Sequence, residues 1–305
     1  MSRPPFVVAP PAVRAGRLAT RRGTFAVLDA APAGTPPAGT VLLVPGYTGS
    51  KEDFIALLMP LAEAGYRAVA VDGRGQYETP GGAGRRAYTL GALAEDVRAQ
   101  AEALRSQPPA SGSPPGALHL VGHSLGGLIA RGAVLRAAAW QGKPEPFASL
   151  TLIGSGPGKV ARWPRWRVRA LSVALPLLGA EAVWRLLHPV AEPGEVGAFL
   201  RRRWLANEPA QLRATGRILR HEPDRVAALA AAAVPVHVVS GERDGAWPVP
   251  LLDRMALRLG AHRTVIRGAE HSPNCEAPGA TAAALTAFWA GLGAARGAAA
   301  VPVRR

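Results

Sequence analysis

Three short stretches of the chain carry side chains that could do nucleophilic chemistry. Residues 121–127 read VGHSLGG, and Ser124 lies there between glycines, after one apolar run and before another. GERDGAWP (241–248) carries Asp244 and RGAEHSP (267–273) carries His271, each directly after an apolar run. A serine hydroxyl is a weak nucleophile unless a base takes its proton and a third group orients that base. Asp244 and His271 are the candidates for those two groups.

The elements around these stretches predict an α/β fold with a mostly parallel central sheet, helices on both faces and an inserted helical cap. Short apolar runs of strand type alternate with helical patterns that begin or end at polar residues and glycines. The expected strands are 24–30, 40–46, 66–73, 117–122, 147–154, 234–241 and 263–268, and the expected helices are 51–64, 89–107, 125–140, 250–259 and about 280–292. Ser50 is the expected N-cap of the first helix.

The spacing G-x-S-x-G, from Gly122 to Gly126, suits a strand that turns sharply into a helix. Such a turn presents Ser124 at the carboxyl end of its strand, where open α/β sheets bind ligands. The next amide, Leu125 N–H, lies at a helix N-terminus and could stabilise an oxyanion. Asp244 and His271 follow two later strands, so all three side chains are expected at the same edge of the sheet.

With these stretches and LLVPGYTGS (42–50), the chain resembles the α/β-hydrolase fold superfamily of serine esterases and lipases from about residue 24 to 292. The resemblance implies that Ser124 is the nucleophile, His271 the general base and then the general acid, and Asp244 the group that orients His271. It also implies an oxyanion hole built from the amides of Leu125 and Tyr47. Pro45 stands where the family's loop usually has histidine.

The expected division of the chain follows from the same pattern. Residues 1–23 are a proline- and arginine-rich N-terminal arm, 24–156 and 233–292 the hydrolase core, 157–232 the helical cap, and 293–305 a flexible tail. The Pro/Ser/Gly-rich stretch 108–116 is expected to be a linker.

The resemblance implies hydrolysis of a carboxylic ester with a partly apolar acyl or alcohol part, without cofactor or metal. A serine nucleophile argues against relatives that attack through an aspartate. The same residues leave open thioester cleavage, acyl transfer, carbon–carbon bond hydrolysis, and a ligand-binding protein without turnover.

Several other residues have simpler interpretations. His123 is expected to pack beside the site, Asp72 and Arg74 to hold a turn, and Cys275 to be buried. Glu242 and Glu270 are weaker candidates for the acid. In the cap, one or two members of a tryptophan set are expected to face substrate, namely Trp163, Trp166, Trp184 and Trp204.

Charge and composition limit which partners the chain is expected to bind. The chain has 305 residues and a net charge of +15, and no motif that would convert this charge into nucleic-acid recognition. A solvated arginine-rich surface is expected, and a binder of membrane surfaces or of nucleic acid is an alternative that charge alone supports. Cys275 is the single cysteine, which favours a reducing compartment and a cytoplasmic location. The apolar stretch 170–183 is too short to span a bilayer and is expected to be a buried or substrate-facing helix.

Overall fold

The computed structural model describes residues 1–107, 116–138, 146–190 and 193–299. Most of the predicted linker at 108–116 therefore lies outside the described residues, as do 300–305 of the predicted tail.

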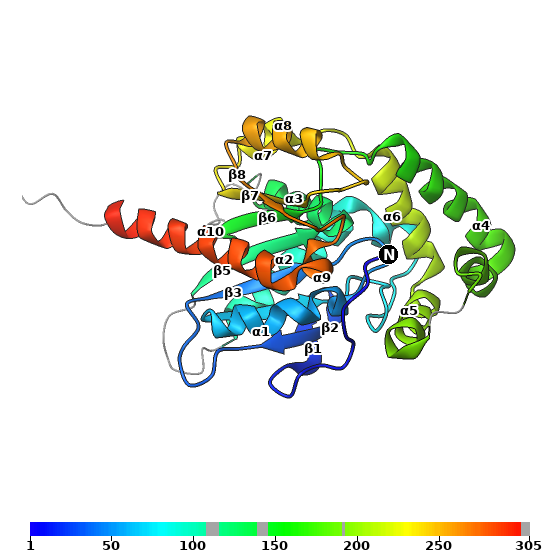
Figure 1. Ribbon diagram of the computed structural model, residues 1–305, viewed down its shortest axis with the longest axis horizontal. Coiled ribbons are helices and arrows are strands. Elements are labelled where there is room, and N and C mark those ends of the chain that lie inside the picture. The colour runs from blue at the N-terminus through cyan, green and yellow to red at the C-terminus, as the bar shows by residue number, and fades with distance from the viewer. Residues whose placement is uncertain (108–115, 139–145, 191–192, 300–305) are drawn as a thin grey trace, which may run out of the picture.

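An eight-stranded sheet forms the centre of the molecule, with strand order β1-β2-β4-β3-β5-β6-β7-β8 (Figure 1). The first two strands pair antiparallel, β2 is antiparallel to β4, and the other neighbours are parallel. The strands are β1 (Arg14–Thr20), β2 (Gly23–Ala30), β3 (Gly39–Val44), β4 (Tyr66–Val71), β5 (Ala117–His123), β6 (Ser149–Ile153), β7 (Val236–Gly241) and β8 (His262–Ile266).

Helices cover both faces of this sheet, which confirms the predicted α/β architecture. In β3, Val41 and Leu43 pack toward α1 and α10, while Leu42 and Val44 pack toward α2, α3 and α8. Successive side chains of a strand point to opposite faces, so a central strand needs apolar residues at every position. The covering helices are α1 (Ile55–Glu63), α2 (Leu90–Ser106), α3 (Leu125–Ala138), α7 (Val226–Ala230), α8 (Val249–Leu259) and α10 (Pro278–Ala299), and the short turns are η1 (Lys51–Phe54), η2 (Arg85–Tyr88) and α9 (Pro273–Glu276).

A helical insertion lies between β6 and β7, beyond one edge of the sheet (Figure 1). It consists of α4 (Arg162–Leu187), α5 (Gly194–Ala206) and α6 (Pro209–His221). Its own apolar cluster includes Trp184, Phe199, Trp204 and Leu212. The Tyr47 hydroxyl of the core donates to the Leu212 carbonyl at 3.1 Å, so the insertion is also bonded to the loop after β3.

The helix α4 is more exposed than the sequence predicted. Residues 164–187 are long and apolar enough, by length and composition alone, to cross a membrane, yet only 17% of the most apolar window is buried. The backbone breaks at Gly179, where φ is 77°. Leu175 and Val183 are buried, but Leu177 is 75% exposed, so the stretch 170–183 is buried on one side only.

Three local features also differ from expectation. Residues 14–20 of the predicted arm form β1, and α10 continues to Ala299, into the predicted tail. The Ser50 side chain does not cap the first helix, because its hydroxyl donates to Glu52 Oε2 at 2.6 Å. Side-chain hydrogen bonds of this kind compete with capping.

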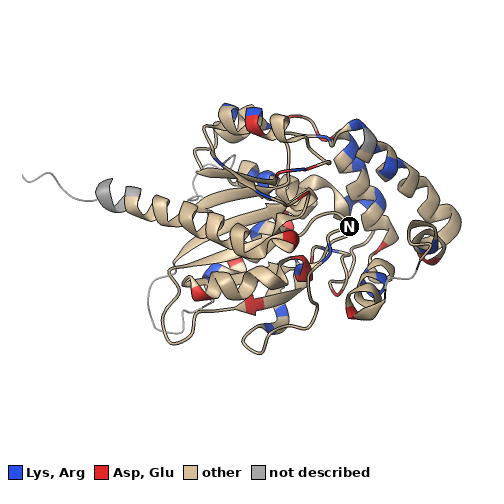
Figure 2. Cartoon of the chain, viewed as in Figure 1, with Lys and Arg blue, Asp and Glu red and all other residues tan. Residues whose placement is uncertain are grey.

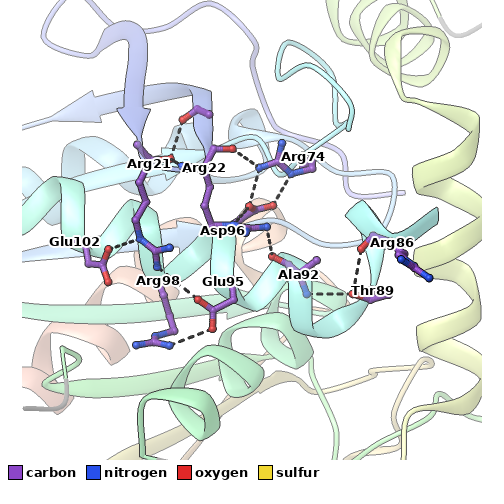
Figure 3. Close-up of polar contacts among 12 residues, drawn as sticks. Arg21, Arg22, Arg74, Arg86, Thr89, Ala92, Glu95, Asp96, Arg98 and Glu102 are labelled. Carbon is purple, nitrogen blue, oxygen red and sulfur yellow. Dashed lines mark hydrogen bonds and ion pairs between the residues drawn. The ribbon is translucent and has the colours of Figure 1, made fainter. Parts of the chain in front are cut away.

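Asp72 and Arg74 have structural contacts, but not with each other. The Arg74 guanidinium binds both carboxylate oxygens of Asp96 on α2 at 2.7 Å, and Arg22 binds Asp96 at 2.6 Å (Figure 3). Asp72 instead accepts from the buried ammonium of Lys51 at 3.1 Å. Arg74 therefore ties the loop after β4 to α2, while Asp72 ties it to the loop after β3.

Candidate functional site

The turn between β5 and α3 holds Ser124 in a strained conformation. Its φ is 54°, the left-handed region that a residue with a Cβ seldom adopts. The Ser124 amide donates to the Ile153 carbonyl of β6 at 2.8 Å, and the Gly127 amide donates to the Ser124 carbonyl at 3.0 Å. A Cβ on Gly126 would overlap the carbonyl oxygens of Val44 and Pro45. The glycine therefore lets α3 start close against β3, as the G-x-S-x-G spacing predicts.

Asp244 and His271 reach the same point from neighbouring strands. Asp244 follows β7 and His271 follows β8, and these strands are parallel neighbours. His271 Nε2 lies 3.0 Å from Ser124 Oγ, and His271 Nδ1 lies 3.0 Å from Asp244 Oδ1. A carboxylate only accepts, so Nδ1 carries the proton and Nε2 is free to accept from the serine hydroxyl. The structure thus brings the three predicted residues into one hydrogen-bonded chain.

The Asp244 carboxylate is held by its own loop. Its Oδ1 accepts from the amides of Ala246 at 2.8 Å and Trp247 at 3.1 Å in addition to His271. Its side chain has no exposed surface, whereas the His271 side chain is 32% exposed. Gly154 has φ 51°, and a Cβ there would lie 3.1 Å from Asp244 Oδ2. The Asp244 carboxylate is therefore fixed in position and shielded from solvent, while part of the His271 side chain stays accessible to an incoming molecule.

The two amides predicted for an oxyanion hole belong to segments that adjoin Ser124. Leu125 is the first residue of α3, and Tyr47 follows Gly46, whose Cβ position would be 3.1 Å from Ser124 Cβ. Within the described residues, neither Leu125 N–H nor Tyr47 N–H donates a hydrogen bond. The Gln76 side chain holds the Tyr47 loop by donating to the Gly46 carbonyl at 2.9 Å. Sequence reasoning missed Gln76, and nothing in its surroundings marks it.

His123 packs beside the site, as expected. Its Nε2–H donates to the backbone carbonyl of His271 at 3.0 Å, and the two rings lie 5.1 Å apart. Burial, with a smaller contribution from His271, lowers the pKa of His123 to about 3. The ring is therefore neutral at ordinary pH and adds no charge beside His271.

The other candidates do not reach His271. The Glu242 side chain accepts from the Gly268 amide at 2.9 Å, and both Glu242 and Glu270 are exposed. Cys275 is buried, burial raises the pKa of its thiol, and its Sγ donates to the Asp53 carbonyl at 3.1 Å. Over the described residues, no group of His, Cys, Asp and Glu side chains could hold a metal ion.

The cap tryptophans have different surroundings from one another. Trp184 and Trp204 are buried, with ring centroids 6.3 Å apart, and Trp204 Nε1 donates to the Ala180 carbonyl at 2.8 Å. Trp166 is exposed on α4. The side chain of Trp163 lies outside the described residues. Trp184 and Trp204 therefore hold α4 against α5.

One buried ion pair joins cap and core near the site, and sequence reasoning missed it. Arg203 of α5 binds Asp53 Oδ1 at 2.6 Å, and neither side chain has exposed surface. Arg203 also donates to the Ser2 carbonyl at 2.8 Å, and the Ser2 and Ser272 hydroxyls lie 3.0 Å apart. The N-terminal segment thus contacts the residue that follows His271. The two charges lie 150 positions apart, and no local pattern pairs them.

Comparisons with known proteins agree with this architecture. The profile of the alpha/beta hydrolase family matches residues 41–284. No curated protein matches the chain.

Several solved structures share the fold over nearly the whole chain. An esterase from Thermogutta terrifontis has 20% identity and a TM-score of 0.70, over 92% of this chain and 99% of that one. An esterase from Exiguobacterium antarcticum has 17% identity and a TM-score of 0.69, over 90% and 99%. A thioesterase domain from the curacin biosynthetic pathway has 18% identity and a TM-score of 0.64, over 90% and 99%. At these identities the similarity establishes the fold.

Proposed function

The chain belongs to the alpha/beta hydrolase family, and we propose that it is a serine hydrolase that cleaves a carboxylic ester through an acyl-enzyme. The observation that carries the proposal is the hydrogen-bonded chain from Ser124 Oγ through His271 to Asp244, with both distances at 3.0 Å. Strain at Ser124 adds support, because a left-handed serine persists only where the surrounding structure imposes it.

The first half of the reaction forms the acyl-enzyme. Ser124 Oγ attacks the ester carbonyl carbon while His271 Nε2 takes the hydroxyl proton. The carbonyl oxygen becomes an oxyanion that accepts from the amides of Leu125 and Tyr47, and Asp244 stabilises the imidazolium. The carbon–oxygen bond to the alcohol then breaks, and His271 gives its proton to the leaving oxygen.

The second half releases the acid. Water attacks the acyl carbon, and His271 takes one of its protons. The tetrahedral intermediate is held by the same two amides, and its collapse breaks the bond to Ser124 Oγ. His271 returns the proton to that oxygen, which restores the starting state.

The proposed substrate class rests on the resemblance and on the structural neighbours. The resemblance to esterases and lipases favours an ester with a partly apolar acyl or alcohol part. The structural neighbours include esterases and a thioesterase domain, so thioester cleavage by the same residues is the second candidate. The single buried cysteine supports a cytoplasmic location as part of the proposal.

The decisive experiment is labelling with a fluorophosphonate probe, followed by peptide mapping. We expect the label on Ser124, no label in Ser124→Ala, and loss of ester turnover in that variant. Ser155→Ala is the matched control, because this buried serine faces the same turn and its hydroxyl has no hydrogen-bond partner among the described residues. Full turnover in Ser124→Ala would refute the proposal.

The bond type needs a second measurement. Matched ester and thioester series of increasing acyl length are compared by kcat/KM, and a competing alcohol tests acyl transfer. Binding of these compounds without turnover or labelling would favour a ligand-binding protein instead.

A further inference from the structure

The outer face of the cap is unusually apolar. Seven of the twelve large apolar side chains that are exposed in the described part of the chain lie between residues 166 and 190: Trp166, Val173, Leu177, Leu178, Leu186, Leu187 and Val190. All of them except Val190 belong to α4, and this helix forms one rim of the molecule in Figure 1. Contiguous apolar surface of this kind marks an interaction site, unlike scattered single residues.

Three of the exposed residues form a stripe along the first part of α4. Trp166, Val173 and Leu177 are spaced seven and four residues apart, which places them on one side of a helix. The opposite side, with Leu175, carries the residues that pack on α5 and α6. A helix with apolar residues on both sides suits a buried element or a lipid environment, and here only one side is covered.

Positive charge borders the stripe. Arg162 and Arg169 lie on the same side as Trp166, four and three residues from it, and both are exposed. Neither arginine forms an ion pair with a carboxylate of the described residues. Figure 2 shows basic residues gathered at the first half of α4 and the adjoining α6.

The positive charge continues into a cavity of about 610 Å³ between α6 and η2. Arg85, Arg213 and Arg217 line it together with Ser172 of α4. The one carboxylate in its lining, Glu222, is already bound to the buried Arg131 at 3.1 Å. Among the described residues, Arg85, Arg213 and Arg217 form no ion pair, so this side of the cap carries positive charge that no carboxylate of the chain balances there.

We propose that the outer face of α4 docks on an anionic lipid bilayer, with its apolar stripe in the acyl region and its arginines at the headgroups. An apolar face bordered by arginines is the pattern of a helix that lies in the membrane interface. Docking itself needs no catalysis. That the docked enzyme takes esters dissolved in the bilayer rests on the proposed function.

The geometry favours lying on the bilayer over crossing it. The break at Gly179 divides α4, and the first part, residues 162–178, is only about 25 Å long at 1.5 Å per residue. A bilayer core is about 30 Å thick. Leu175, Val183 and Trp184 are also already packed inside the cap.

A second copy of the chain is a poorer occupant. The single acidic residue of α4 is Glu181, and it already binds Arg185 at 3.3 Å and Arg201 at 2.9 Å. Pairing two α4 helices would bring their arginines together without carboxylates to match them. A bilayer that contains anionic lipid supplies that charge along the whole face.

The test is flotation of the full chain with vesicles of phosphatidylcholine alone or with phosphatidylserine added. We expect binding to the anionic vesicles that weakens as salt rises. Leu177→Ser with Leu178→Ser should reduce the partition coefficient at least about tenfold, because the variant loses apolar surface that the acyl region would bury. Arg162→Gln with Arg169→Gln should reduce it about tenfold or more, because two attractions to anionic headgroups are lost.

Matched controls lie on α8 of the core. Leu257→Ser removes a leucine that is 82% exposed, and Arg254→Gln removes an exposed arginine. Both should leave vesicle binding unchanged. All variants should hydrolyse a short soluble ester like the parent chain, which shows that they are folded.

The outcomes separate the two proposals. Failure to bind anionic vesicles, or equal binding by the α4 variants and the parent, overturns the docking proposal. So does a dimer in size-exclusion chromatography that the leucine variant dissociates, because the stripe then faces a second copy. Vesicle binding by a chain that Ser124→Ala leaves fully active would refute the proposed chemistry and leave docking intact.

Discussion

Replacing Arg203 by methionine should strongly destabilise the protein. Arg203 binds Asp53 at 2.6 Å, both side chains are fully buried, and methionine keeps the apolar stem without the charge. The Asp53 carboxylate would then be buried without its cation. Removing one partner of a buried pair costs about 3–5 kcal/mol, because the remaining charge has neither water nor a counter-ion.

The stability lost in Arg203→Met should depend on pH. Burial raises the pKa of Asp53, and Arg203 opposes that rise. Without Arg203, the folded state holds a proton on Asp53 at pH values where the unfolded chain, with a pKa near about 3.9, has released it. Burial already raises the pKa of Asp53 in the parent, so the free energy of unfolding of the variant should fall relative to the parent as pH rises above that pKa, where only the variant keeps its proton.

The assay is urea denaturation followed by tryptophan fluorescence, at pH 5 and pH 8. Arg201→Met is the control on the same helix, because its partner Glu181 and Arg201 itself are partly exposed, and such pairs contribute about 1 kcal/mol or less. Adding Asp53→Asn to Arg203→Met should recover much of the loss. A cost for Arg203→Met no greater than that for Arg201→Met, or strictly additive effects of the two changes, would contradict the reasoning.

Three further predictions concern the site and its surroundings. Gly126→Ala should destabilise the fold by more than about 1 kcal/mol, measured as a lowered urea midpoint, because its Cβ would overlap the Val44 carbonyl. His123→Gln should flatten the loss of stability between pH 6.5 and 5. The parent ring stays neutral in the folded state with a pKa of about 3, while the unfolded chain gains a proton, a difference of about 1.4 kcal/mol per pH unit at most. Equal slopes for both proteins would count against that pKa. Tyr47→Phe should cost about 1 kcal/mol of stability through the lost bond to Leu212 yet keep kcat, because only its backbone amide is assigned to the oxyanion. A large fall in kcat would show a role for the hydroxyl.

Local sequence was sufficient for the elements that position the site. Every strand predicted from residue 24 onward is present. The central strands are the clearest in the sequence, because buried parallel strands need unbroken apolar runs. The glycines around Ser124 predicted the sharp turn, since few residue types tolerate such close approach. The missed strand β1 pairs along an edge and exposes most of its residues, so its sequence, RAGRLAT, has little apolar patterning.

The residues of the site were also identified from sequence, as candidates placed at one edge of a sheet. The 3.0 Å contacts among Ser124, His271 and Asp244 came from the structure. Parallel strands end at a common edge, so residues that follow them meet there. The partners of Arg74 and Arg203 could not be predicted, because an arginine's sequence neighbours do not determine which distant carboxylate it reaches.

What the sequence determined by itself was therefore the fold class, the turn that holds Ser124, and the order of the three polar residues along the chain. These features depend on local conformation and on which residue types can be buried. The tertiary structure alone decided which side of α4 is covered. The segment is apolar on both sides, so its periodicity does not distinguish them, and Leu175 is buried while Leu177 is exposed only because α5 and α6 pack against one side.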